Sequence, residues 1–279
     1  MTQQPIPPQP PRRVVSFVSS ATETLFALGC GEALVGVTPY CGRYVPNLGV
    51  PIAGDYLKAD IDHLRSLEPD LVLVTSGIQA ALAKRLAEAG LPVHALPLPA
   101  SRFGILENQI ALGGLMHRVA EARALCTRME AGFAELIASA PLLRPTVFIE
   151  MWCGRHLRGI GGLSFIHDLV ELAGGVAVPM VRSEAYPVPD LELVAALRPQ
   201  AILFFQEPEF PVDAEATLAG RGWSWGPRII SSDITKGRNI IHDGPSFLDT
   251  ARWLRDQLQP SPPALLEGCA LRTSLVGHG

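Results

Sequence analysis

One loop of this chain gathers side chains that can bind a ligand. Residues 39–44 hold two tyrosines, a cysteine and an arginine, in a longer segment rich in Pro, Gly and Tyr. The aromatic rings can line a cleft, and the guanidinium can meet amides or a carboxylate of a ligand. Because loops between strands often carry binding residues, we predict a binding role for Arg43 and Tyr44, and for Tyr56 in the same segment.

Thiol and imidazole groups make a metal site an alternative to test. Cys153 and His156 lie three positions apart, and Cys41 belongs to the first loop. Thiolate and imidazole both ligate cobalt or iron. A polar hairpin turn is the interpretation we favour for Cys153 and His156, so no metal site is predicted and the three residues remain candidates. His242, between the last expected strand and the last helix, is a candidate ligand contact or a packing residue.

Sequence motifs and composition exclude several functions. The chain has no GxSxG elbow, no GxxxxGK[ST] phosphate loop and no HExxH helix, so we predict no enzymatic activity and no catalytic cofactor. The net charge of -4 and the lack of a Lys/Arg run longer than two argue against nucleic acid. No apolar run approaches the roughly 20 residues of a membrane-spanning helix.

The two ends of the chain and its cysteines indicate the cellular compartment of the protein. Residues 1–12 are Pro-rich without the apolar segment of a secretory signal, and we expect a disordered lead-in. Residues 260–279 are expected to form a flexible tail. Five cysteines without a CxxC pair indicate reduced thiols. These features favour a cytoplasmic location for the chain as written, and a periplasmic or extracellular one if an export segment was removed.

A sequence motif that occurs twice indicates the architecture. Residues 64–75 and 194–205, 130 positions apart, each contain a helix end, a proline that stops it and a buried apolar strand. Apolar strands that alternate with helices belong to parallel sheets covered on both faces. We therefore predict two Rossmann-like α/β lobes with parallel sheets, residues 13–102 and 141–259, and a cleft between them.

The connection between the lobes is expected to be helical. Apolar residues keep a helical period over 103–140 without proline, which predicts one long backbone helix, with a possible bend at Gly113 and Gly114. Ser20 is expected to cap the first helix, with Glu23 completing a capping box. Strands are expected at 13–19, 34–37, 71–75, 93–96, 146–150, 201–205, 229–230 and 240–241, and further helices at 61–67, 79–89, 163–173 and 247–258.

Two α/β lobes joined by a long helix resemble the helical-backbone class of ABC-importer substrate-binding proteins, which carry cobalamin, ferric siderophores or haem. The resemblance covers about residues 13–258. It rests on RVVSFVSSATETL at 13–25, VGVT at 35–38, LEPDLV at 67–72 and VELAGG at 170–175. The start of the second lobe, VFIEMW at 147–152, is most similar to the cobalamin-binding branch. The resemblance implies a cobalamin-like corrinoid as the bound ligand.

The same resemblance implies which residues would contact the ligand. In that branch aromatic side chains from both lobes face the flat corrin ring. The matching positions are Tyr44 and Tyr56 in the first lobe, with Trp152 and Tyr186 in the second. Aromatic walls suit such a ligand because they supply large apolar area with little conformational entropy to lose.

The resemblance also implies a partner, the permease of an ABC importer. The docking carboxylates of the family lie one in each lobe and match Asp62 and Glu192, again 130 positions apart. Acidic groups that meet basic sockets would set orientation and association rate. The first lobe carries Asp where Glu is usual, which shortens the reach of that side chain.

Two alternatives use the same fold. A ferric siderophore or haem would need cations that face the cleft, and Arg43, Arg155 and Arg182 are the candidates. A cytoplasmic tetrapyrrole or metal chaperone, or an enzyme, would place a reactive thiol or imidazole in the cleft. For that alternative the three metal-site candidates named above are the test positions.

Overall fold

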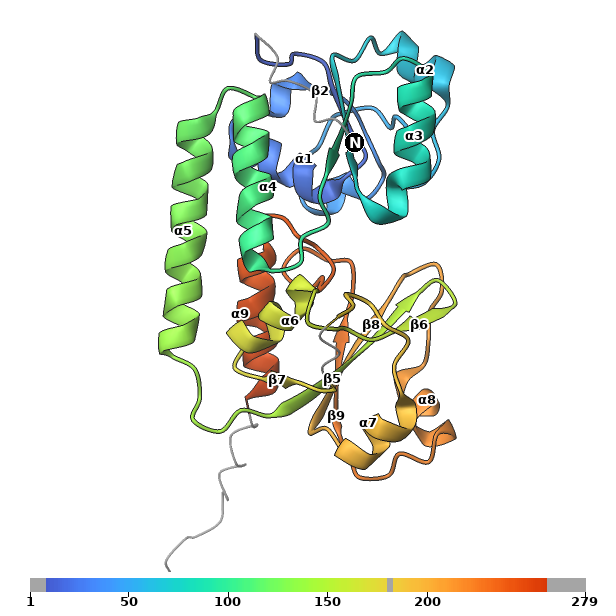
Figure 1. The fold of residues 1–279 in the computed structure, drawn as a ribbon, viewed down its shortest axis with the longest axis vertical. Helices are drawn as coiled ribbons and strands as arrows, with labels where there is room; N and C mark the ends of the chain where they lie inside the picture. The colour runs from blue at the N-terminus through green and yellow to red at the C-terminus, as the bar shows by residue number, and fades with distance from the viewer. Residues whose placement is uncertain (1–8, 180–182, 260–279) are drawn as a thin grey trace, which may run out of the picture.

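Two α/β lobes lie end to end, with a pair of helices along one side of both (Figure 1). The structure, a computed structural model, describes residues 9–179 and 183–259. In this part of the chain the predicted fold class is confirmed, because each lobe contains a largely parallel sheet.

The sheet of the first lobe has the order β2-β1-β3-β4, and all of its strands are parallel. Its elements are β1 (Val14–Ser16), α1 (Ser19–Ala27), β2 (Leu34–Val37), α2 (Ile61–Ser66), β3 (Leu71–Thr75), α3 (Ala80–Glu88) and β4 (Val93–Leu96). Short 3-10 turns occur at Gly31–Ala33, Cys41–Arg43 and Gly77–Gln79.

Alternation along the strands divides the first-lobe core between the two sheet faces. Leu71 and Leu73 of β3 pack in a cluster with residues of α1, while Val72 and Val74 pack with residues of α2 and α3. Successive side chains of a strand point to opposite faces, so a fully apolar strand predicts helices on both sides. This is the arrangement that the repeated motif predicted.

The sheet of the second lobe has the order β6-β5-β8-β9, with β7 also paired to β5. All pairs are parallel except the β5-β6 hairpin. Its elements are β5 (Thr146–Cys153), β6 (His156–Arg158), α6 (Phe165–Leu172), β7 (Val176–Ala177), α7 (Leu191–Leu197), β8 (Ala201–Gln206), α8 (Ala214–Gly220), β9 (Arg228–Ser232) and α9 (Phe247–Leu258). Helices α6 and α9 cover one face of the sheet, and α7 and α8 the other.

The single helix predicted over 103–140 is wrong, because α4 (Arg102–Leu115) and α5 (Val119–Ala138) form a hairpin. The chain reverses at His117, whose φ is 54°. A Cβ on Gly113 would lie 2.4 Å from the Cβ of Ala122, so a glycine is needed where the helices meet. Apolar periodicity continued across the turn because both helices bury one face.

The hairpin nevertheless braces both lobes. In α5, Ala122 and Leu125 belong to the first-lobe core, and Met129 and Phe133 belong to the second-lobe core. The helix has 20 residues, which at about 1.5 Å per residue gives about 30 Å, the size of a small domain. The two lobes therefore share a common helical support.

Two local predictions are also wrong. Helix α1 begins at Ser19 and its N-cap is Val18, so Ser20 lies inside the helix and forms no capping box with Glu23. Residues 240–241 form a turn rather than a strand. The segment between β9 and α9 is instead held by side chains that contact the first lobe.

Candidate functional site

Glu23 joins the two lobes through a buried ion-pair network. Its carboxylate lies 2.8 Å from His242 Nε2 and 2.8 Å from Lys236 Nζ. It also accepts hydrogen bonds from the main-chain N (3.2 Å) and the Oγ (2.9 Å) of Ser246. Glu23 belongs to α1 and the three partners belong to the segment between β9 and α9. The network, which we call the Glu23 network, therefore connects elements more than 200 positions apart.

The charge of Glu23 is fixed by these partners. Burial acts to raise its pKa, but the hydrogen bonds and positive charges of His242 and Lys236 outweigh burial and lower the pKa to about 2. The carboxylate is therefore ionised at neutral pH. A buried carboxylate with a lysine and a histidine around it favours the conformation in which the lobes contact each other.

The rings of Tyr44 and His242 stack on each other beside the Glu23 carboxylate. Their rings stack with centroids 3.6 Å apart and planes 5° from parallel. Tyr44 donates to the carbonyl of Ile234 at 3.3 Å and accepts from Asn239 Nδ2, and burial raises its pKa to about 12. The prediction that Tyr44 and His242 contact the ligand stays a prediction, and in this structure the two residues contact each other. Both are buried in the lobe contact, with 3% exposure each.

A second group lies between the lobes and remains partly accessible. It contains Tyr40 and Tyr56 from the first lobe, and Cys153 and Tyr186 from the second. Tyr40, Cys153 and Tyr186 pack against the core of the second lobe. The pKa of Tyr56 is raised mainly by burial. The charge of Asp243 is the second cause and Tyr186 is the third. We call these four residues the tyrosine cluster.

Polar contacts hold Tyr56 by its main chain and Tyr186 by its side chain. Gln79, fully buried, donates from Nε2 to the carbonyls of Tyr56 (2.7 Å) and Phe17 (3.1 Å) and accepts from the N of Thr75 (2.7 Å). This anchors the loop of Tyr56 to the carboxyl end of β3. Tyr186 hydrogen-bonds with Ser164, and burial raises its pKa to about 12. The structure thus brings together Tyr56 and Tyr186, two of the four predicted wall residues.

Two carboxylates stand beside the tyrosine cluster. Glu207, the first residue after β8, accepts the N–H of Gly154 at 2.7 Å, and Gly154 has φ 61° in the turn between β5 and β6. Asp243 is half-buried and lines a small cavity with Ser20 and Thr75 of the first lobe. Sequence reasoning missed both residues. The available signal was position, since ligand sites of parallel sheets lie beyond the carboxyl ends of the strands.

Trp152 lies on the other side of the sheet from Cys153. It packs against the cluster of Phe148 and Trp223, and its Nε1 donates to Glu150 at 2.9 Å. Glu150 is fully buried and makes a bidentate ion pair with Arg221 at 2.7 and 2.9 Å. The structure therefore places Trp152 in a packing network and does not bring it to the tyrosine cluster, because neighbouring residues of β5 point to opposite faces.

The thiol and imidazole candidates do not come together among the described residues. Cys41 is buried and its Sγ accepts from Thr22 Oγ1 at 3.2 Å. Burial, and then the charge of Glu207, raises the pKa of Cys153, so the thiol stays protonated at neutral pH. His156 is exposed in the β5-β6 hairpin, as the favoured hairpin interpretation predicted.

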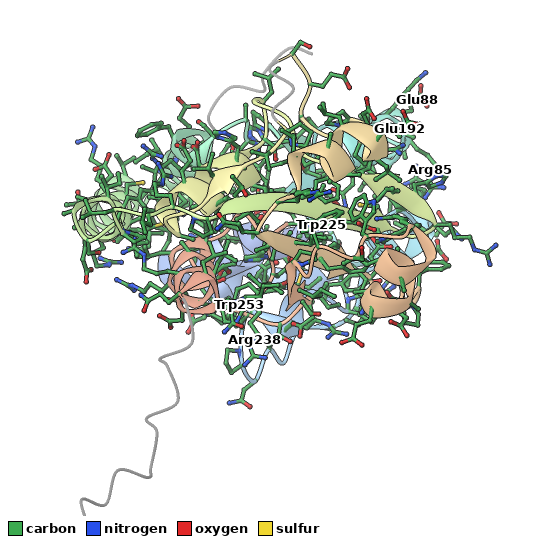
Figure 2. The ribbon with its side chains drawn as sticks, turned by 90° about the horizontal axis from the view of Figure 1, so that it is seen from below. Arg85, Glu88, Glu192, Trp225, Arg238 and Trp253 are labelled. Atoms are coloured by element: carbon green, nitrogen blue, oxygen red, sulfur yellow. The ribbon has the colours of Figure 1, made fainter. Side chains whose placement is uncertain are left out.

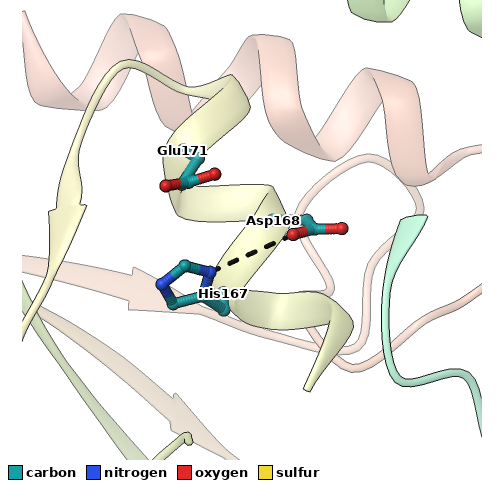
Figure 3. A group of neighbouring side chains, drawn as sticks. All are labelled: His167, Asp168 and Glu171. Carbon is teal, nitrogen blue, oxygen red and sulfur yellow. Dashed lines mark ion pairs between the residues drawn. The ribbon is translucent and has the colours of Figure 1, made fainter. Parts of the chain in front are cut away.

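A different group has metal-ligand geometry. His167, Asp168 and Glu171 of α6 present ligand atoms within 4.8 Å of one another (Figure 3). Asp168 already accepts the N–H of Arg102 at 2.7 Å. The hydrogen bond between Asp168 and His167 is the main cause that raises the pKa of His167. This group therefore ties α6 to the start of α4, and the raised pKa opposes metal binding.

The predicted docking carboxylates occupy equivalent places in the two lobes. Asp60 caps α2 by accepting from the N of Asp62 at 2.9 Å, and Asp190 caps α7 by accepting from the N of Glu192 at 3.0 Å. Both acidic side chains are exposed, and Figure 2 shows Glu192 at the surface. Asp62 pairs with Arg65 at 3.3 Å.

The structure places two of the three arginines that were predicted for an anionic ligand. Arg43 and Arg155 are exposed, and Arg182 lies outside the described residues. Helices of the described part of the chain are too short or too polar to cross a membrane.

A sequence model described as periplasmic binding protein matches residues 14–217, well over half of the chain. The chain belongs to the periplasmic binding protein family. This confirms the family that the sequence resemblance indicated.

Curated relatives share part of their length with this family member. Two cobalamin-binding proteins from two strains of Halobacterium salinarum are 28% identical over 201 residues, which cover 69% of this chain and 53% of each relative. The chain thus spans about half the length of these relatives. An uncharacterised ABC transporter substrate-binding lipoprotein of Bacillus subtilis is 25% identical over 221 residues, 77% of this chain and 68% of that protein.

Solved structures show the same fold. A periplasmic haem-binding protein from Pseudomonas aeruginosa has a TM-score of 0.75 and 23% identity, covering 90% of this chain and 94% of its own. A petrobactin-binding protein from Bacillus subtilis has a TM-score of 0.76 and 14% identity, covering 91% and 94%. At these identities the likeness establishes the two-lobed architecture alone.

Proposed function

We propose that this family member binds a corrinoid of the cobalamin type between its lobes, as the substrate-binding component of an ABC importer. The observation that carries the proposal is the tyrosine cluster. Tyr56 and Tyr186 come from opposite lobes, are both half-buried, and lie near enough for Tyr186 to raise the pKa of Tyr56. Rings from two lobes can hold a flat macrocycle between them with little loss of side-chain entropy.

The relatives favour a corrinoid over other ligands of the fold. The two Halobacterium salinarum proteins are named for cobalamin, while the haem and petrobactin proteins match in structure at lower identity. Binding of this kind needs no catalytic cofactor and no turnover. The ligand would leave when the lobes separate, so release depends on the strength of the Glu23 network.

We further propose that Asp62 and Glu192 contact the permease. They lie at the same position in the first turn of equivalent helices, one in each lobe. Each follows an Asp cap that fixes the helix start, which holds the two carboxylates in a defined geometry. Two exposed charges on separate lobes would let a permease read the relative position of the lobes.

Tyr56→Ala and Tyr186→Ala test the binding site. Each substitution removes one aromatic face, and we expect the affinity for cyanocobalamin to fall roughly 10- to 100-fold in calorimetric titration. The control is Phe26→Ala, which removes an exposed ring at the far end of α1 and should leave affinity unchanged. Equal affinity of the two tyrosine variants and the wild type would contradict the assignment.

A further inference from the structure

The charges around the tyrosine cluster are mostly negative. Tyr40 donates to Glu209 at 3.4 Å, and Glu207 is fixed by the Gly154 N–H. Asp243 lies near both Tyr56 and Tyr186, and among the residues that the structure describes no Arg or Lys is one of the main charges that act on Tyr40, Tyr56 or Tyr186. The site is therefore a negatively charged aromatic surface.

These carboxylates lack the compensation that Glu23 has. Among residues 9–179 and 183–259, Asp243 has no hydrogen bond or ion pair, and Glu207 has only a main-chain donor. Lys236, which lies with Asp243 in the segment between β9 and α9, is bound to Glu23 at 2.8 Å. Arg158 acts on the Cys153 thiol and donates to the carbonyl of Leu157. A half-buried carboxylate without a cationic partner is stabilised by a ligand that supplies hydrogen-bond donors or positive charge.

The ligand classes of this fold differ in the charge they would bring. Haem carries two propionates, and ferric catecholate chelates are anionic, so both need cations from the protein. A corrin ring is bordered by primary amides, whose N–H groups donate to carboxylates, around a positively charged cobalt ion. Only the last class matches a surface that offers acceptors and negative charge.

We infer that Glu207 and Asp243 determine specificity, by accepting amide N–H groups of a corrinoid and by repelling ligands that carry carboxylates. This inference rests on the proposed function. It assigns selection to charge, whereas the tyrosine rings provide contact area for any flat macrocycle.

A matched pair of ligands tests the inference. Cyanocobalamin is compared with its monocarboxylic acids, in which one peripheral amide is hydrolysed and a single negative charge is added to the same scaffold. For the wild type at low salt we expect the acids to bind at least roughly 10-fold more weakly, with the difference reduced at high salt. In the double variant Asp243→Asn, Glu207→Gln the difference should fall to about 2-fold, because the repelling charges are gone.

Glu88→Gln is the matched control. Glu88 is an exposed carboxylate on α3 that points outward (Figure 2) and pairs only with Lys84 at 3.8 Å, so the discrimination should stay at the wild-type value. Equal binding of cyanocobalamin and the acids by the wild type would overturn the inference and leave the proposed function standing. Tight haem binding by the wild type without cyanocobalamin binding would overturn both. If the double variant does not fold, the wild type decides the question. A preference for cyanocobalamin over the acids that falls at high salt supports the inference, and a preference that salt does not change contradicts it.

Discussion

Glu23 is the residue on which the contact between the lobes depends most. It is a buried carboxylate with partners from a segment more than 200 positions away. The sequence predicted that Glu23 would complete a capping box, but its side chain binds His242 instead. Removing one member of a buried charge network leaves the others without compensation. The energetic effect should therefore exceed that of any exposed ion pair of this chain.

Glu23→Gln should destabilise the protein by about 2 to 4 kcal/mol, measured by urea unfolding. Glu135→Gln serves as the control, because the Glu135–Arg252 pair at 3.4 Å is exposed and should contribute less than about 1 kcal/mol.

Acid should remove the contribution of Glu23. Its pKa is lowered on folding from 4.5 to about 2, so the folded state binds this proton less readily than the unfolded state. The stabilisation is complete above pH 4.5 and is lost as pH falls towards 2. The stability difference between wild type and Glu23→Gln should shrink over that range. A difference that stays constant with pH would show that the ion pair does not carry the effect.

At the scale of elements, the α4-α5 hairpin sets the spacing of the lobes. Two adjacent glycines of α4 allow a matched test. A Cβ on Gly113 would lie 2.4 Å from Ala122, whereas a Cβ on Gly114 would meet nothing within 4 Å. Gly113→Ala should destabilise by about 1 to 3 kcal/mol, and Gly114→Ala should stabilise by up to about 1 kcal/mol, by urea unfolding. Similar effects of both changes would mean that the helices do not approach closely at Gly113.

Elements were predicted well where local pattern decides structure. The bounds of β2, β3, β4 and α9 were predicted to the residue, because each is a short apolar or amphipathic run between clear breakers. The break between α4 and α5 was missed, since the turn contains no Gly or Pro and His117 adopts a left-handed conformation that is uncommon for a residue other than Gly. Ser20 and Glu23 satisfied a local capping rule, but tertiary contacts with His242 decided their role.

Site residues were harder to predict for a related reason. Tyr56 was predicted from its loop and from the resemblance, and Tyr186 from the resemblance alone. Glu207 and Asp243 lie far apart in the sequence of the second lobe, and each comes near Tyr56 only in the folded protein. Tyr44 and Tyr40 lie in the same loop, and sequence reasoning chose the one that is buried in the lobe contact. Which ring of a loop faces the partner lobe depends on the turn at Cys41–Arg43, which spacing alone does not determine.

At the scale of the whole molecule, docking should separate from ligand binding. Asp62→Lys with Glu192→Lys should leave cyanocobalamin affinity within about 2-fold, yet weaken association with a cobalamin-importing permease by more than roughly 10-fold. The control is Glu215→Lys, in the first turn of α8, another helix with an Asp cap. Unchanged permease association of the double variant would contradict the docking assignment.

Two lobes on a shared helical support, a buried ion-pair network and a tyrosine cluster are the features from which we propose that the protein encloses a flat ligand. The most direct test is calorimetric titration of the 279-residue chain with cyanocobalamin. We predict one-to-one binding with a submicromolar dissociation constant. Absence of binding, with haem or a ferric siderophore bound instead, would contradict it.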